Sequence, residues 1–198
     1  MTDVSVLFVC LGNICMWQIS GDNDDNVDDG RLTDRTGRSP MAEAVFRHIV
    51  SSRDGKTVTF SKLDSAGTCA AHLHDPPDPR TMSTLKKHGI TDFTHAARRV
   101  KTSDFTEFDY LIAMDQENYD SLMYSRSRVK GEKLAEVRMF GDFDADRLAD
   151  GGRGESEEVP DPYYGGRDGF DRVYDMVTRL SNGFIDYLEK KHAVDAAN

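Results

Sequence analysis

A cysteine and an arginine in the N-terminal part of the chain have the types and settings that nucleophilic chemistry needs. Cys10 directly follows the apolar run Val4–Val9 and precedes a turn of small residues that ends in Cys15. Arg38 stands at the start of a segment whose apolar residues recur at helical spacing. A thiol surrounded by backbone N–H groups and an arginine is stabilised as the thiolate, which is a nucleophile near neutral pH. A lone cysteine at the end of a strand would favour a purely structural role.

The segments around these residues predict a site for a phosphate group. Ser39 suits the N-cap of a helix, and Pro40 suits its first position. A strand, a loop and a helix N-terminus in this order place loop N–H groups and the helix dipole around one anion. The planar guanidinium of Arg38 can donate to two phosphate oxygens. The combination with Arg38 therefore favours a catalytic role for Cys10.

A second candidate lies far along the chain, in Asp161-Pro162-Tyr163-Tyr164-Gly165. A carboxylic acid placed over a phosphate can give a proton to a leaving phenolate. Tyr163 and Tyr164 would line the cleft and stack against an aromatic ring. Taken alone, this sequence is a turn. Together with the cysteine loop, it indicates a general acid.

Strands that alternate with helices must hold these residues together. We expect strands over 4–9, 57–63, 108–114 and 134–140, with an exit loop at Asp64–Gly67. Helices are expected over 39–51, 80–88 and 170–188, with a single turn at 103–107, another helix opening at 115, and polar loop over 141–160. This alternation predicts an α/β fold, a small three-layer sandwich with a four-stranded parallel sheet. Residues 1–198 would form a single domain, with ligands at the carboxyl ends of the strands.

Composition limits the partners and the location of the protein. The net charge of −10 argues against nucleic-acid binding, and no apolar run is long enough to span a membrane. Three cysteines are too few for the disulfide framework of a small secreted protein. The N-terminus lacks the basic region and long apolar stretch of a secretory signal. We therefore expect a cytoplasmic protein, acting as a monomer, with Cys69 buried.

The stretch Met16–Gly37 interrupts the predicted phosphate site. It separates Cys10 from Arg38 by 28 positions and holds six aspartates against two arginines. This composition predicts a disordered acidic insertion, and such a length is unusual for a connection in a compact domain. Six carboxylates beside a dianion site would raise its negative potential. The chain as written is therefore expected to show weak or no catalysis.

If Met16–Gly37 is left out, Cys15 is followed directly by Arg38, and the sequence becomes Val-Cys-Leu-Gly-Asn-Ile-Cys-Arg-Ser-Pro-Met-Ala-Glu. This closely resembles the active-site loop of the low-molecular-weight protein tyrosine phosphatases, whose signature is Cys-x5-Arg-Ser. Asp-Pro-Tyr-Tyr resembles the general-acid motif of the same family. Further matches run through the chain: Asp64-Ser65-Ala66-Gly67-Thr68, Asp78-Pro79-Arg80, His88-Gly89-Ile90, His95-Ala96-Ala97-Arg98, Phe108-Asp109-Tyr110 and Met114-Asp115.

The resemblance implies a role for each residue of the motif. Cys10 would attack phosphorus and carry a phosphocysteine, while Asp161 would protonate the leaving group and then activate water. Arg38 would hold phosphate oxygens together with the cradle of loop amides, which comprises Leu11, Gly12, Asn13, Ile14 and Cys15. Ser39 would donate a hydrogen bond to the sulfur of Cys10, and His95 would support the loop. No metal or organic cofactor is implied.

The resemblance also implies finer properties of the loop. Asn13 would hold the loop in its strained shape, and Cys15 would form a reversible disulfide that protects Cys10 from irreversible oxidation. Ile14 stands where related protein-arginine phosphatases carry a threonine, so it favours phosphotyrosine. Many relatives have a tryptophan where this chain has Ala71-His72. The expected substrates are phosphotyrosine-containing proteins and small aryl phosphates.

Two other functions remain open from the sequence. A catalytically impaired protein could keep only phosphate binding or a regulatory role. An arsenate reductase would share the fold and the loop, but that chemistry needs downstream resolving cysteines, and only Cys69 remains. Asp161 and its neighbouring tyrosines also argue against reductase chemistry.

Three interpretations of Met16–Gly37 compete: a regulatory loop, a mark of a dead phosphatase, and a translated unspliced intron. Cys15-Met16-Trp17 can be encoded with GTATGT, a fungal-type splice donor, and Leu32-Thr33 with the branch-point sequence CTAAC. Thr36-Gly37 can encode an intron end in AG. Excision between these points keeps the frame, restores a cysteine codon at position 15 and joins it to Arg38. This codon logic favours the intron hypothesis.

Overall fold

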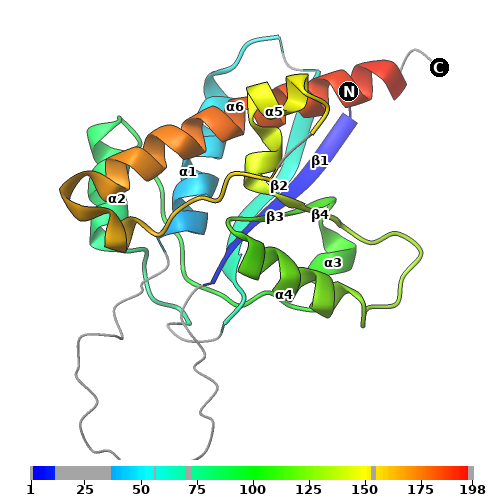
Figure 1. The fold of residues 1–198 in the computed structure, drawn as a ribbon, viewed down its shortest axis with the longest axis horizontal. Coiled ribbons are helices and arrows are strands. Elements are labelled where there is room, and N and C mark those ends of the chain that lie inside the picture. Colours follow the sequence, from blue (N-terminus) through cyan, green and yellow to red (C-terminus); the bar gives the residue numbers. More distant parts are fainter. Residues whose placement is uncertain (1, 12–36, 56, 70–72, 153–154, 196–198) are drawn as a thin grey trace, which may run out of the picture.

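Four parallel strands form a sheet at the centre of the molecule, in the order β2-β1-β3-β4 (Figure 1). The strands are β1 (Thr2–Cys10), β2 (Val58–Gly67), β3 (Tyr110–Ala113) and β4 (Glu136–Met139). The structure is a computed structural model and describes residues 2–11, 37–55, 57–69, 73–152 and 155–195. Helices cover both faces of the sheet, so the predicted α/β class and three-layer arrangement are confirmed.

Strand β1 is the centre of the sheet because its apolar side chains are buried on both faces. Val6 and Phe8 belong to the core under one helical layer, and Leu7 and Val9 belong to the core under the other. A parallel strand between two helical layers needs this nearly continuous apolar run. Its carboxyl end, Cys10, pairs in register with the end of β2 at Gly67. The expected strand over 4–9 is therefore present and slightly longer.

Helices α1 (Arg38–Ser52), α2 (Pro79–Lys87) and α6 (Gly169–Asp195) form one layer, and α6 packs against both of the others. Aromatic rings fill the space between this layer and the sheet: the Phe46 ring lies 5.4 Å from that of Phe8 and 5.7 Å from that of Phe184. The short α3 (Asp104–Glu107) and α4 (Gln116–Arg126) cover the other face. No helix in the described parts of the chain is long and apolar enough to cross a membrane.

Two regions of the chain differ clearly from the sequence expectation. Strand β2 continues through Asp64–Gly67, where an exit loop was expected, because these residues pair with Leu7–Cys10. Between 140 and 150 the chain forms a 3₁₀ helix, η1 (Phe140–Phe143), and a short helix, α5 (Ala145–Ala149). Burial of the Phe140 and Phe143 rings fixes the first, and the Asp144 carboxylate, which accepts from two N–H groups, caps the second.

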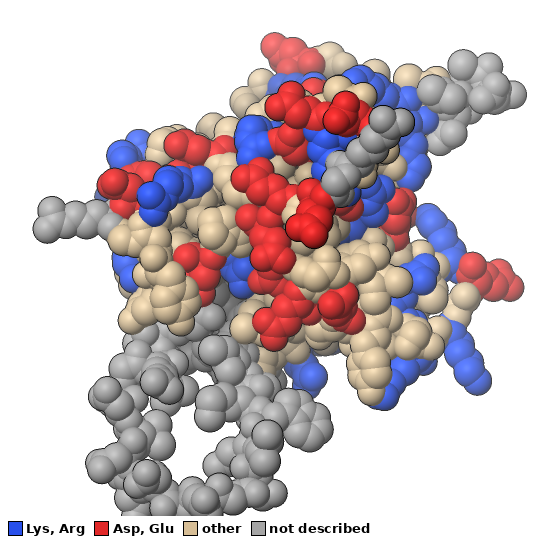
Figure 2. All heavy atoms as spheres, in the orientation of Figure 1, with Lys and Arg blue, Asp and Glu red and all other residues tan. Residues whose placement is uncertain are grey.

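The excess of acidic over basic residues in the sequence is visible on the molecular surface. Figure 2 shows Asp and Glu side chains gathered down the middle of the face on which α5 and α6 lie. Some carboxylates of the chain pair with arginines, as Glu157 does with Arg179. This face therefore favours neither nucleic acid nor other polyanions.

Candidate active site

The carboxyl end of β1 brings Cys10 against the first turn of α1. Ser39 Oγ donates a hydrogen bond to Cys10 Sγ over 3.1 Å, and it also lies 3.3 Å from the carbonyl oxygen of Ala66. Both side chains are buried. The sulfur of Cys10 is therefore held at the end of β1 by the first turn of α1.

The N-cap prediction for Ser39 is wrong. Helix α1 begins at Arg38 with Gly37 as its N-cap, and no side chain caps it. The physical reason is that the Ser39 hydroxyl is buried beside the sheet, where the sulfur of Cys10 and the Ala66 carbonyl are its partners. The hydroxyl is therefore directed at the thiol and not at the helix backbone.

Arg38 lies beside Cys10 and is held by two acceptors. Its Nη1 donates to Asp115 Oδ2 over 2.6 Å and to the carbonyl oxygen of Val159 over 3.0 Å. Burial alone would lower the pKa of Arg38, but the charges of Cys10, Asp115 and Asp161 raise it above its ordinary value. The other guanidinium N–H groups offer a parallel pair of donors.

Asp115 is a functional residue that the sequence analysis did not identify. Its Oδ2 binds Arg38, and its Oδ1 accepts from the backbone N–H of Asn118, which caps α4. Each carboxylate oxygen of Asp115 has its own partner, so Asp115 links the guanidinium of Arg38 to the N-terminus of α4. The pair Met114-Asp115 places a carboxylate just after the third predicted strand, but the sequence does not indicate which residue that carboxylate binds.

The segment before Asp161 is added to the sheet by backbone contacts. The N–H of Val159 donates to the carbonyl oxygen of Met114 over 2.8 Å. Gly141 allows the close approach of this segment, because a Cβ there would lie 2.0 Å from the carbonyl oxygen of Glu157. These contacts bring Asp161 to the same edge of the sheet as Cys10.

Asp161 opens the 3₁₀ helix η2 (Pro162–Asp168). Its Oδ1 accepts from the backbone N–H of Tyr163 over 2.9 Å. Tyr163 and Tyr164 are exposed, with their rings at 81° and their centroids 5.3 Å apart. The guanidinium of Arg80 lies 5.2 Å from the centre of the Tyr163 ring. The two tyrosines are thus placed at the surface next to the carboxylate.

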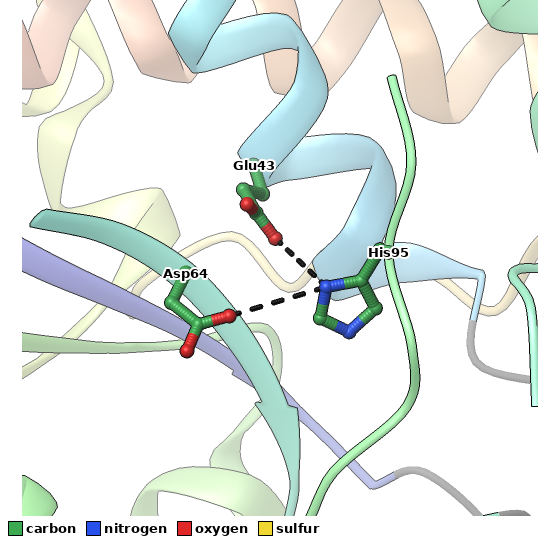
Figure 3. A group of neighbouring side chains, drawn as sticks. All are labelled: Glu43, Asp64 and His95. Atoms are coloured by element: carbon green, nitrogen blue, oxygen red, sulfur yellow. Dashed lines mark ion pairs between the residues drawn. The ribbon is translucent and has the colours of Figure 1, made fainter. Parts of the chain in front are cut away.

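His95 lies on the segment between α2 and α3, outside any helix or strand, and contacts α1 and β2. Its Nδ1 is 3.3 Å from Glu43 Oε2 and 3.9 Å from Asp64 Oδ1 (Figure 3). Its Nε2 is 3.4 Å from Ser65 Oγ, which itself donates to Glu43 over 2.8 Å. Ser65 pairs with Phe8 of β1, so the network braces the strand that ends at Cys10.

Glu43, Asp64 and His95 also form a group whose ligand atoms lie within 4.8 Å of one another. Each carboxylate already has a cationic partner, since Arg47 Nε donates to Glu43 over 2.9 Å and Arg98 Nε to Asp64 over 2.8 Å. A metal ion would have to compete with both arginines. The contacts favour a hydrogen-bonded network.

The start of the predicted phosphate cradle is held by the segment after β2. The carbonyl oxygen of Leu11 accepts from the N–H of Cys69 and from the hydroxyl of Thr68, both over 3.1 Å. Cys69 is buried, as expected. The other cradle residues, Gly12, Asn13, Ile14 and Cys15, lie outside the described residues, as do Ala71-His72 and the stretch Met16–Gly37 up to position 36.

Sequence comparison identifies the family. The family model for the low molecular weight phosphotyrosine protein phosphatases matches residues 33–194, which is most of the chain. The chain belongs to this family. A phosphatase of this name from Schizosaccharomyces pombe is 40% identical over 183 residues, covering 92% of this chain and 96% of the relative. Its namesake from Saccharomyces cerevisiae is 34% identical, covering 92% and 93%.

Structure comparison agrees with the assignment. A protein tyrosine phosphatase from Entamoeba histolytica has 31% identity and a TM-score of 0.64, covering 96% of this chain and 99% of that one. The four-stranded parallel sheet flanked by helices is the α/β fold of these structural relatives. The arsenate reductase alternative is not supported by these matches.

Replacing Glu43 with glutamine is expected to destabilise this phosphatase at neutral pH. Burial alone would raise the pKa of Glu43, but hydrogen bonds from His95 and Ser65 and the charge of Arg47 hold it below its ordinary value. Such a carboxylate stabilises the fold above its unfolded pKa, and this stability is lost as the pH falls through the lower folded pKa. Glu43→Gln should lower the free energy of unfolding by about 2 kcal/mol at pH 7.

Urea unfolding at pH 7 and at pH values below 4.5 tests this expectation. The difference between wild type and Glu43→Gln should shrink as the wild-type carboxylate is protonated, so the two curves should converge in acid. A matched control is Glu117→Gln, which removes an exposed carboxylate from α4. A difference that stays constant with pH would contradict the assigned charge interactions.

Proposed function

We propose that this chain is a protein tyrosine phosphatase that hydrolyses phosphotyrosine and small aryl phosphates through a phosphocysteine. The observation that carries the proposal is the placement of Cys10, with Ser39 Oγ 3.1 Å from its sulfur, beside Arg38 at the carboxyl edge of the sheet. Family membership and the site point to the same chemistry. Phosphotyrosine-containing proteins are the proposed substrates.

The reaction runs in two displacements. The Cys10 thiolate attacks phosphorus, the bond to the aryl oxygen breaks, and Asp161 gives its proton to the leaving phenolate. Water then attacks the phosphocysteine, Asp161 takes the proton, and inorganic phosphate leaves with regeneration of the thiolate. No step needs a metal or an organic cofactor.

Arg38 and the loop amides stabilise the charge that develops on the phosphoryl oxygens. Nη1 is engaged by Asp115 and Val159, which leaves Nε and Nη2 as the parallel pair for two oxygens. Because Asp115 and Val159 already hold Arg38, its guanidinium needs no reorganisation when the phosphate binds. Such preorganisation lowers the activation free energy of the reaction. Tyr163 and Tyr164 would form the wall against which the phenol ring stacks.

The residues on either side of Met16–Gly37 would form one phosphatase domain. We propose that this stretch is absent from the active protein, as the intron hypothesis requires, and that the chain with it has weak or no activity. We call the chain without Met16–Gly37 the shortened chain. The shortened chain is proposed to act in the cytoplasm as a monomer.

Hydrolysis of p-nitrophenyl phosphate by the full and the shortened chain tests the proposal. The shortened chain should be active and also release phosphate from a phosphotyrosyl peptide, while the full chain should be slow. Activity in both would show that the insertion is tolerated. Activity in neither would overturn the phosphatase proposal and favour a phosphate-binding protein. Messenger RNA that still encodes Met16–Gly37, from a gene without GTATGT at Cys15-Met16, would exclude the intron hypothesis.

A further inference from the structure

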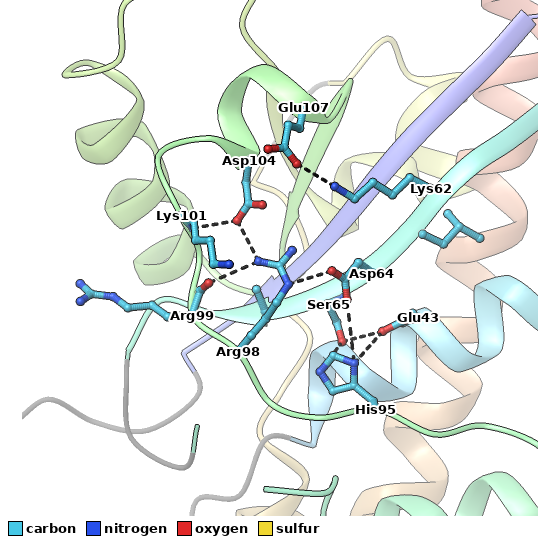
Figure 4. A network of polar contacts seen from close by, with 12 residues as sticks. Glu43, Lys62, Asp64, Ser65, His95, Arg98, Arg99, Lys101, Asp104 and Glu107 are labelled. Atoms are coloured by element: carbon cyan, nitrogen blue, oxygen red, sulfur yellow. Dashed lines mark hydrogen bonds and ion pairs between the residues drawn. The ribbon is translucent and has the colours of Figure 1, made fainter. Parts of the chain in front are cut away.

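An open groove lies beside the proposed active site, on the side of α4. Its volume is about 500 Å³. Basic and hydroxyl side chains dominate its lining: Thr68, Arg99, Lys101, Thr102, Ser121 and Ser125. Figure 4 shows the side chains of Arg99 and Lys101 extending from the segment that follows Arg98. Thr68 also supports Leu11 of the phosphate cradle, and the other five residues have no role in the proposed chemistry.

Backbone pairing fixes the groove close to Cys10. Gly67 pairs with Cys10 in the β1–β2 ladder, and it forms a separate bridge with Arg99. Neighbouring strands lie about 4.8 Å apart, so two spacings place the Arg99 backbone about 10 Å from that of Cys10. Thr68, in the groove wall, donates its hydroxyl to the carbonyl oxygen of Leu11. The groove therefore adjoins the phosphate cradle directly.

The two groove cations differ from the neighbouring arginine in how they are paired. Arg98 is held by Asp64 over 2.8 Å and by Asp104 over 2.9 Å (Figure 4). Arg99 and Lys101 form no ion pair with any described residue; Arg99 Nε donates only to the carbonyl oxygen of Thr68, over 3.3 Å. They leave a local positive charge available to an anion.

We propose that this groove binds a second anionic side chain of the substrate protein, a phosphate or a carboxylate, when the phosphotyrosine is in the active site. This inference rests on the proposed phosphatase function. An extended peptide advances about 3.3 Å per residue, so about 10 Å corresponds to some three residues from the phosphotyrosine. The Arg99 guanidinium would donate hydrogen bonds to two oxygens of the anion, and Lys101 would add a second positive charge. The threonine and serine hydroxyls of the groove would donate to the remaining oxygens.

Binding of phosphotyrosyl peptides to the shortened chain with Cys10→Ser tests the inference without turnover. Three otherwise identical peptides carry alanine, glutamate or phosphoserine three residues before the phosphotyrosine, and a second set carries them three residues after it. Fluorescence anisotropy measures the Kd at low and at physiological salt. In one of the two sets, phosphoserine should bind about fivefold tighter than alanine, with glutamate between them, and the difference should shrink as salt screens the groove. The order of the two anionic peptides separates a phosphate from a carboxylate preference.

Charge-removing variants connect the preference to the groove. In Arg99→Gln/Lys101→Gln the three peptides of each set should bind equally, while the alanine peptides keep their Kd. The matched control Lys86→Gln/Lys190→Gln removes two exposed lysines from α2 and α6 and should keep the preference. Equal binding of all peptides to the parent chain, or a preference that survives in the groove variant, would overturn the inference. If the alanine peptides also fail to bind and the shortened chain does not hydrolyse p-nitrophenyl phosphate, the phosphatase proposal falls as well.

Discussion

Replacing Cys10 with serine is expected to reduce hydrolysis of p-nitrophenyl phosphate by the shortened chain about 10⁴-fold or more. A serine hydroxyl is not ionised near neutral pH, so it is a far weaker nucleophile than the thiolate that it replaces. The fold should survive, because serine is no larger than cysteine and can accept the hydrogen bond from Ser39. Loss of activity would therefore report chemistry and not unfolding.

The control for this prediction is Cys69→Ser. Cys69 is also buried, and its contact with Leu11 runs through its backbone N–H, which serine keeps. Its activity should stay within about threefold of the parent chain, and the unfolding temperature of Cys10→Ser should stay within about 4 °C of it. A Cys10→Ser enzyme that still turns over, or a Cys69→Ser enzyme that does not, would contradict the assignment of the nucleophile.

Replacing Asp161 with asparagine is expected to slow release of a poor leaving group by about 10²- to 10⁴-fold. Asparagine keeps the oxygen that accepts from the Tyr163 N–H, so η2 should form as before. It has no acidic proton to give, so the phenolate must leave unprotonated. The loss should be largest for phosphotyrosine and smaller for p-nitrophenyl phosphate, whose phenol is the stronger acid.

Rates with a series of aryl phosphates of increasing phenol acidity test this expectation. The dependence of kcat/KM on leaving-group acidity should be shallow for the parent chain and steep for Asp161→Asn. Asp168→Asn removes an exposed carboxylate from the same 3₁₀ helix and should leave the dependence shallow. An equal loss for all leaving groups would mean that Asp161 does not act as the proton donor.

Local patterns in the sequence were enough to predict most of the fold. The apolar run before Cys10 could only be a strand buried on both faces, and the stripe of apolar residues after 170 indicated the long helix α6. Strand β2 was predicted too short because Asp64 and Ser65 are polar. Their pairing with β1 and their contacts with Arg98 and Glu43 compensate for that polarity, and no local pattern contains those partners.

The proposed reacting groups could be named from the sequence, but most of the contacts that position them could not. Cys10, Arg38 and Asp161 follow from motif and spacing once the stretch Met16–Gly37 is set aside. The pairing of Arg38 with Asp115 joins residues 77 positions apart, and it depends on the carboxyl ends of β1 and β3 meeting at one edge. The hydroxyl of Ser39 could be read as a cap because serine at a helix start usually is one. Only tertiary packing turns it toward the sulfur.

Direct detection of the covalent intermediate tests the central claim. The shortened chain with Asp161→Asn is mixed with p-nitrophenyl phosphate, quenched within milliseconds, digested and analysed by mass spectrometry. Asp161 is proposed to activate the water of the second displacement, so its loss should allow the intermediate to accumulate. One phosphoryl group on the peptide that contains Cys10 is the predicted result. Turnover without a phosphoryl group on Cys10, or with one on His95 or Cys69, would contradict the proposed mechanism.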